Sequence, residues 1–98
     1  MYFIARFEDN PDSLHIRDAQ YANHLAFLAE HSEHILAAGP LREDKDGPPV
    51  GALWLVEAPD LAAVITMLDD DPFWIHGLRA DRSVLQWTKT VPDHPVTI

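Results

Sequence analysis

The first segment of the chain, residues 2–8, alternates between hydrophobic and polar positions in the sequence YFIARFE. Phe3, Ala5 and Phe7 fall on one face of a segment with this period. A period of two with aromatic and β-branched residues is typical of a strand with one buried face. We therefore predict a strand here. Asn10 and Pro11 follow as a turn that can cap a helix.

The period of the pattern becomes helical over residues 14–31. The apolar residues that fall on one stripe at this spacing are Leu14, Tyr21, Leu25 and Leu28. A stripe of this kind is typical of a helix that buries one face. We therefore predict that these four residues form the buried stripe and that His24 lies at its margin.

The remaining segments predict strand, strand, helix and strand, in that order. They span residues 34–38, 52–57, 60–69 and 82–89. Gly39-Pro40 is expected to end the second strand in a turn, and residues 42–49 form a polar loop. Pro72 is expected to stop the second helix, because proline lacks an amide hydrogen and disfavours helical geometry in the preceding residue.

This order of elements is βαββαβ, which predicts a ferredoxin-like α+β fold with a four-stranded antiparallel sheet. Two helices cover only one face of such a sheet. Yet the third strand is apolar on both faces, with Leu53 and Leu55 on one and Trp54 and Val56 on the other. An open apolar face is unusual on a soluble monomer. A homodimer that packs sheet to sheet is the favoured solution, and a cover made by the long loop and the tail is the alternative.

Composition narrows the class of protein. The 98 residues fit one domain, with a core of about residues 2–91 and an extended tail, 92–98. The chain has no cysteine, which excludes disulfides and thiolate chemistry. No stretch resembles a signal peptide or membrane span, so a cytoplasmic location is expected. The net charge of −9 disfavours nucleic acid and anionic membranes as partners.

Three consecutive acids, Asp69, Asp70 and Asp71, stand at the end of the second predicted helix. Consecutive helical residues point about 100° apart, so the three cannot readily share one ion. The six histidines match no metal-binding spacing either, and we expect neither a metal nor a cofactor. Acids are unfavourable at a helix C-terminus, which indicates either that the cost is tolerated for a reason or that a nearby cation compensates the charge. Protonated His24, Arg79 or Arg82 could be that cation.

Three segments together resemble the YCII-related (YciI-like) family. They are DSLHIRDAQYANHLAFL at residues 12–28, ILAAGPL at 35–41 and DDPFWIHGL at 70–78, followed by a strand that ends in Trp87. The resemblance covers about residues 2–91. It implies the ferredoxin-like fold, a dimer formed through the sheets, and a cleft where the helical histidine, His24, meets the aspartate of the Asp-Pro pair, Asp71.

The resemblance also implies an enzyme, since some relatives are dehydrochlorinases of chlorinated hydroxyquinol-type rings. His24 would then be the general acid/base and Asp71 the carboxylate that orients it. The sequence alone favours a solvent-facing or hydrogen-bonded core histidine instead. The chain departs from the family where Tyr21 stands in place of a frequent arginine and Ala52 in place of a frequent serine. The first change predicts a different or less charged substrate.

Further residues are candidates for binding the substrate. They are Arg17, Tyr21, Gly39, Pro40 and Phe73. Arg17 could neutralise an anion, Gly39 could allow a ligand to approach the backbone, and Phe73 could form a pocket wall.

The leading hypothesis is a cofactor-free acid/base enzyme, of the lyase, isomerase or dehydrochlorinase type, for a small aromatic or cyclic molecule. The alternatives are a non-catalytic ligand-binding or accessory subunit and a cofactor-free monooxygenase.

Overall fold

The computed structural model describes residues 1–91; the predicted extended arm, 92–98, lies outside them. The four strands are β1 (Tyr2–Asp9), β2 (Ile35–Arg42), β3 (Pro49–Glu57) and β4 (Arg79–Trp87). The helices are the short 3-10 helix η1 (Pro11–Ser13), α1 (His15–Glu30), α2 (Leu61–Leu68) and α3 (Pro72–Ile75).

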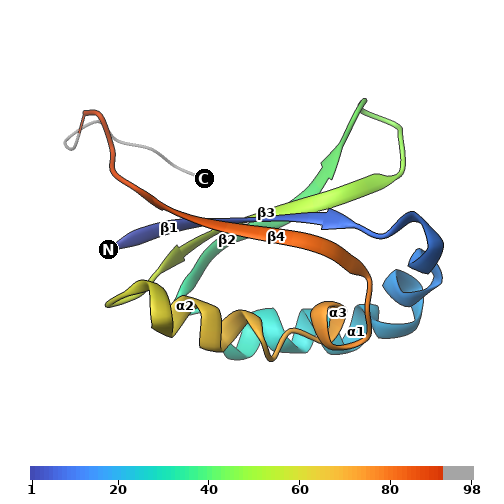
Figure 1. Ribbon diagram of the computed structural model, residues 1–98, viewed down its shortest axis with the longest axis horizontal. Helices are drawn as coiled ribbons and strands as arrows, with labels where there is room; N and C mark the ends of the chain where they lie inside the picture. The colour runs from blue at the N-terminus through green and yellow to red at the C-terminus, as the bar shows by residue number, and fades with distance from the viewer. Residues whose placement is uncertain (92–98) are drawn as a thin grey trace.

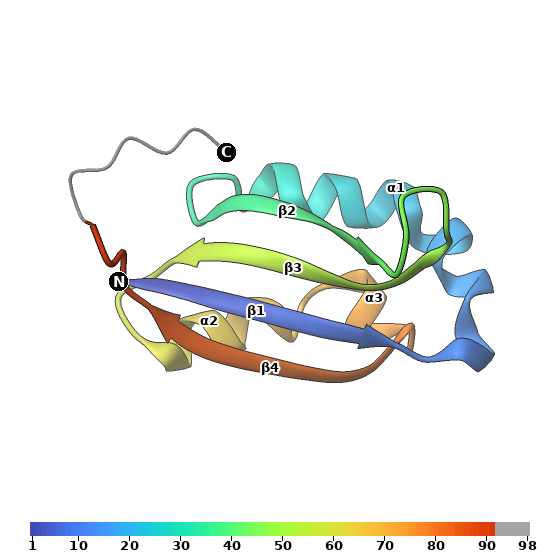
Figure 2. The same cartoon turned by 90° about the horizontal axis from the view of Figure 1, so that it is seen from above.

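The strands form one antiparallel sheet in the order β2-β3-β1-β4. The helices within residues 1–91 lie on one face of this sheet, and no helix or strand of these residues covers the other face (Figure 1). The predicted ferredoxin-like α+β fold is therefore confirmed. Seen from above, α1 runs along the β2 edge of the sheet, whereas α2 and α3 lie beneath β1 and β4 (Figure 2).

The core lies between the sheet and the helices. Its buried residues come from alternate positions of β1 and β3, together with residues of the helices and of β2 and the segment after β3: Phe3, Ala5, Phe7, Phe27, Ile35, Ala52, Trp54, Val56, Ala58, Val64 and Leu68. The predicted inward face of β1 and the division of β3 into two faces are both found. Strand alternation thus identified the sheet's contribution to the core.

The predicted buried stripe of α1 is wrong for three of its four residues, whereas Leu28 is partly buried and packs against the core. Leu14 precedes the helix, and Tyr21 and Leu25 are about half exposed, at 52% and 47%. The two residues of α1 that are buried are His24 and Phe27. A helix that lies along the edge of a sheet, rather than over its centre, has few side chains in contact with the core. Much of its apolar stripe is therefore not covered by the sheet and can face a cavity.

The strand β2 is longer than predicted and contains Gly39-Pro40 instead of ending there. Proline is tolerated because β2 is the edge strand, where not every amide hydrogen has a partner. The sheet register places Pro40 opposite Ala52, on the helix side, and Gly39 opposite Leu53, on the open side.

Pro72 begins a helix and does not stop one, which also corrects the prediction. Helix α2 ends at Leu68, with Asp69 as its C-cap. Asp71 is extended (φ −65°, ψ 125°) and is the N-cap of α3, with Pro72 in the first turn. Proline is favoured there because the first amide hydrogens of a helix need no intrahelical partner. Because Pro72 begins α3, Asp71 is placed at the N-terminus of this helix.

The open face of the sheet carries a row of apolar side chains. Ile4 of β1 lies in register with Leu55 of β3 and with Leu85 of β4, which is 68% exposed. The next row pairs Tyr2 with Trp87, whose rings meet edge to face at 6.2 Å. None of the helices in residues 1–91 combines the length and apolar character needed to cross a membrane.

A substitution at Gly51 tests the close packing of β3 against β1. A Cβ atom at Gly51 would lie 2.0 Å from the backbone oxygen of Phe7, so the strands must separate to accept alanine. We expect Gly51→Ala to lower the free energy of unfolding by about 1–3 kcal/mol or more in urea denaturation.

Gly39→Ala is the matched control, because a Cβ atom at Gly39 meets nothing within 4 Å. Its stability should be unchanged or raised by up to about 1 kcal/mol, since alanine restricts the unfolded chain more than glycine does. Equal losses in the two variants would contradict this account of Gly51.

Candidate active site

A buried hydrogen bond joins His24 on α1 to Asp71 before α3. The Nδ1 atom of His24 lies 2.8 Å from Oδ1 of Asp71, across 47 positions of sequence. The Asp71 side chain is fully buried and that of His24 is 9% exposed. With an ionised Asp71, Nδ1 donates this bond and the lone pair resides on Nε2. The pair thus has the arrangement of an oriented histidine base.

The local structure around Asp71 fixes its carboxylate in place. Oδ1 also accepts a hydrogen bond from the backbone amide of Phe73, 3.2 Å away, which caps α3. Oδ2 is buried and has no hydrogen-bond partner among residues 1–91. A carboxylate held by a helix cap and a histidine at once has little freedom to rotate.

The three aspartates occupy three different environments. Asp69 is bound by Arg82, whose Nη2 lies 2.5 Å from Oδ1, and Asp70 is exposed. Asp71 is buried against His24. A compensating cation is therefore present for Asp69, Asp71 is bonded to a histidine, and Asp70 faces outward. Within residues 1–91 no group of three potential ligands is arranged to hold a metal ion.

Phe73 forms one wall of the site. Its ring stacks on the His24 imidazole, with ring centroids 4.0 Å apart and planes inclined by 14°. The Trp54 ring of β3 lies 5.9 Å from the imidazole. These aromatic contacts hold the imidazole plane, so that the ring and its hydrogen bond have one orientation.

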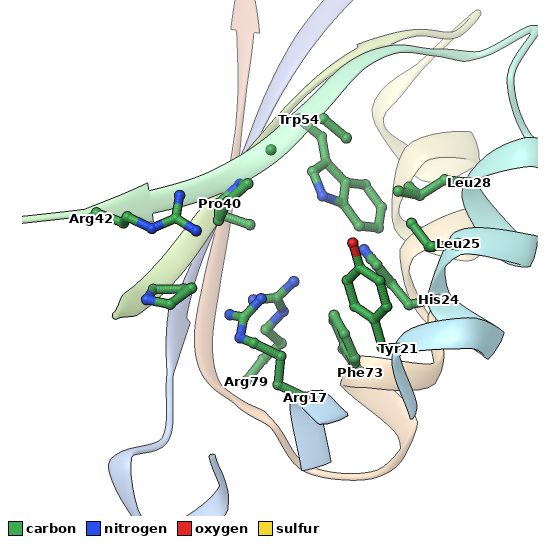
Figure 3. Close-up of a pocket in the computed structure, with 14 residues that line it drawn as sticks. Arg17, Tyr21, His24, Leu25, Leu28, Pro40, Arg42, Trp54, Phe73 and Arg79 are labelled. Carbon is green, nitrogen blue, oxygen red and sulfur yellow. The ribbon is translucent and has the colours of Figure 1, made fainter. Parts of the chain in front are cut away.

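A cavity of about 260 Å³ opens beside this pair, between α1 and the β2 edge of the sheet. Tyr21, Leu25 and Leu28 extend into it from α1, and Pro40 faces them from β2 (Figure 3). Three arginines, Arg17, Arg42 and Arg79, also line it. One end of the cavity is therefore apolar and aromatic, and the other is cationic.

Asp9, at the end of β1, connects two of these arginines. Its Oδ1 accepts a 2.6 Å hydrogen bond from Nη1 of Arg79, and its Oδ2 is paired with Nη2 of Arg17. The Arg79 side chain is 1% exposed and that of Asp9 is 2% exposed. Burial lowers the pKa of Arg79, and the hydrogen bond and charge of Asp9 partly oppose this.

The structure gathers the residues proposed from the sequence around one cavity. Arg17, Tyr21, His24, Gly39, Pro40 and Phe73 line it, and Asp71 lies behind His24. Gly39 contributes backbone only, and, its two chain neighbours aside, no atom of residues 1–91 lies within 4 Å of the position that a Cβ atom would take there. Tyr21 does stand where an arginine was expected, but three other arginines supply positive charge.

Sequence reasoning did not assign Asp9, Arg42 or Trp54 to the site, and it considered Arg79 only as a possible cation beside the three aspartates. Arg79 opens the final strand immediately after the buried Leu78, and a charged residue at such a position was a usable signal. Asp9 gave none, since an acid at the end of a strand is ordinarily solvated. Trp54 was assigned correctly to one face of β3, but its neighbours across the helix layer could not be known.

Fold and site together define the class of this protein. It has a ferredoxin-like α+β fold, and a buried histidine–aspartate pair borders an arginine-lined cavity. The chain belongs to the YCII-related family, because the model of the YCII-related domain matches residues 1–88. No curated protein matches the chain.

Solved structures agree with this assignment. The chain resembles 5-chloro-2-hydroxyhydroquinone dehydrochlorinase from Burkholderia phenoliruptrix in complex with 2,5-dihydroxybenzoquinone, with 32% identity and a TM-score of 0.82. The match covers 90% of this chain and 94% of that one.

Two further structures share the fold at lower identity. An antibiotic biosynthesis monooxygenase has 20% identity and a TM-score of 0.54, and the match covers 92% of this chain and 98% of that one. A variant of SnoaB, a cofactor-independent oxygenase from Streptomyces nogalater, has 21% identity, a TM-score of 0.53 and coverage of 94% and 96%.

The burial of Asp71 predicts a large effect of its removal on stability. Asp71→Ala leaves Nδ1 of His24 without its acceptor and removes the cap of α3. We expect a loss of about 2–4 kcal/mol in the free energy of unfolding, measured by urea denaturation. Asp70→Ala, at the exposed neighbour, should change it by less than about 0.5 kcal/mol. Similar values for the two variants would argue against the different environments of the two acids.

Proposed function

We propose that this protein is a small cofactor-free enzyme that moves a proton on a small aromatic or cyclic substrate. His24 is the general acid/base and Asp71 orients it. The observation that carries the proposal is the buried 2.8 Å bond between them, beside an open cavity. The 32% identity with a dehydrochlorinase that binds a dihydroxyquinone supports a substrate of the hydroxylated ring type.

The geometry suits proton transfer by Nε2. Asp71 fixes the proton on Nδ1 and stabilises the imidazolium that forms when Nε2 accepts a second proton. Phe73 stacks on one face of the imidazole and shields that face from water, and the Trp54 ring lies 5.9 Å away. The apolar walls of the cavity, Leu25 and Leu28, provide a surface for a flat ring.

The reaction that fits best is elimination of hydrogen halide from a halogenated hydroxylated ring in its keto form. His24 takes the proton from the carbon next to the one that bears the halogen. The electron pair of the broken C–H bond becomes a new double bond, and the halide leaves with the electrons of the carbon–halogen bond. No electrons are gained or lost overall, so the step requires no oxidant or cofactor.

We further propose that the protein is a homodimer in which two open sheet faces pack together. Ile4, Leu55 and Leu85 form an apolar row across three strands, and Tyr2 and Trp87 extend it. Leucine at 68% exposure and tryptophan at 37% on one face are costly to leave in water. The helices cover only the opposite face (Figure 1).

Removal of the imidazole tests the catalytic proposal. With 5-chloro-2-hydroxyhydroquinone as substrate, we expect the wild-type protein to release chloride and His24→Ala to lower kcat by about 10²–10⁴-fold. His76→Ala, which removes an exposed histidine, should keep the wild-type rate. Chloride is measured by ion chromatography, and folding by circular dichroism.

Two results would contradict the catalytic proposal. One is a wild-type rate in the folded His24→Ala variant. The other is a wild-type protein that releases no chloride and exchanges no ring hydrogen of this compound with deuterated solvent. The second result together with tight binding of the compound would favour a non-catalytic ligand-binding subunit.

A charge on the open face tests the homodimer. We expect Leu85→Asp to convert the dimer to a monomer in analytical ultracentrifugation, because it buries a carboxylate in an apolar interface. Leu61→Asp is the control, since Leu61 is also exposed, at 49%, but lies on α2. A monomeric wild-type protein, or a Leu85→Asp variant that stays dimeric, would refute this interface.

A further inference from the structure

We propose that Arg17 and Arg79, held in place by Asp9, form a subsite for an ionised oxygen of the substrate. This inference rests on the proposed function, because it takes the cavity beside His24 to be the substrate site. It names the substrate class: a ring that carries an anionic oxygen, such as a phenolate or an ionised hydroxyquinone. Asp9 is then a positioning residue, which acts through the arginines.

The first argument is the unused hydrogen-bonding capacity of the two arginines. A guanidinium has five N–H donors, and Asp9 accepts one hydrogen bond from each arginine. The Nε atom of Arg79 is buried and has no hydrogen-bond partner among residues 1–91. Both guanidinium groups extend into the cavity, toward the β2 side (Figure 3). Donors therefore remain for a ligand oxygen.

The second argument is charge. Asp9 supplies one negative charge for two arginines whose side chains are 1% and 19% exposed, and Arg42 adds a third cation at the rim. The other carboxylate nearby, Asp71, is bonded to His24. Burial already disfavours the charged form of Arg79. The cavity therefore has an excess of positive charge, although the whole chain has a net charge of −9. A bound anion would compensate this excess.

The third argument is the position of Phe73. In Figure 3 its ring lies between the His24 imidazole and the guanidinium groups of Arg17 and Arg79. The imidazole stacks on Phe73 at 4.0 Å, and the guanidinium carbons lie 5.5 and 5.1 Å from the ring centre. Because His24, Arg17 and Arg79 all contact Phe73 and all line the cavity, a substrate ring in the cavity can have its reacting carbon near His24 and its charged oxygen near the arginines.

A purely structural role is the alternative. Asp9 ends β1, Arg79 begins β4 and Arg17 lies in the first turns of α1, so the ion pairs also join three elements. The two roles differ in one measurable respect. A structural cluster affects stability and all ligands alike, whereas an anion subsite discriminates by the charge of the ligand.

Binding of two quinones separates these roles without any turnover. The first probe is 2,5-dihydroxybenzoquinone, whose hydroxyl groups are acidic, and the second is its uncharged analogue 2,5-dimethoxybenzoquinone. Isothermal titration calorimetry with the wild-type protein should show tighter binding of the dihydroxy compound. Arg17→Gln should weaken that binding by about 10- to 100-fold, the equivalent of one charge-assisted hydrogen bond, and leave the dimethoxy compound unaffected.

Arg82→Gln is the matched control. Arg82 is also ion-paired, with Asp69, and also lies over an aromatic ring, that of Trp74 at 3.9 Å, but it does not line the cavity. Its loss should leave the affinity for both quinones unchanged. The subsite is tested by binding and the proton-transfer proposal by chloride release, so that failure of one and failure of the other are distinguishable.

Asp9→Asn tests the positioning role. Once the arginines lose their anchor, we expect KM for an anionic ring substrate to rise about tenfold while kcat changes by less than about threefold. A change in kcat alone, or equal affinity of wild type and Arg17→Gln for the dihydroxy compound, overturns the proposal. So does wild-type binding that does not distinguish the two quinones.

Discussion

The hydrogen bond between His24 and Asp71 is the interaction on which the site and much of the helix layer depend. It connects the middle of α1 to the start of α3, two elements with no sequence proximity. The bond is buried in a low-dielectric environment. The hydrogen bond is strong there, and either polar group would destabilise the fold if its partner were removed. Because Pro72 and Phe73 directly follow Asp71, the position of Asp71 also determines theirs. The Phe73 ring therefore stacks on the His24 imidazole.

The position of α1 explains why a cavity exists beside this pair. A helix centred over the sheet would bury its apolar stripe, but α1 lies along the β2 edge (Figure 2). Its fully buried residues are His24 and Phe27, and Leu28 packs partly against the core. Tyr21, Leu25 and Leu28 line the cavity. The misassigned stripe is therefore informative: residues that look like core by period are the walls of the proposed substrate site.

The charge of the cavity is opposite in sign to that of the whole chain. The surface is strongly acidic overall, whereas the cavity contains three arginines. Asp9 organises two of them from a position that is almost fully buried. Phe73 contacts both the imidazole and the guanidinium groups, so the proton-transfer group and the cationic cluster share one aromatic wall. We infer a substrate that has both a flat apolar body and a negative end.

The sequence by itself determined the order of elements, the inward faces of β1 and β3 and the surplus apolar face, because strand period and element order are local properties. His24 and Asp71 became a pair only through the family resemblance. Tertiary structure alone decided which side of α1 is buried, that Pro72 begins a helix, and that Asp9 lies beside Arg17 and Arg79. These features depend on how a helix is placed against a sheet edge and on contacts between residues up to 70 positions apart. Neither the hydrophobic period nor the composition of a segment can predict these long-range contacts.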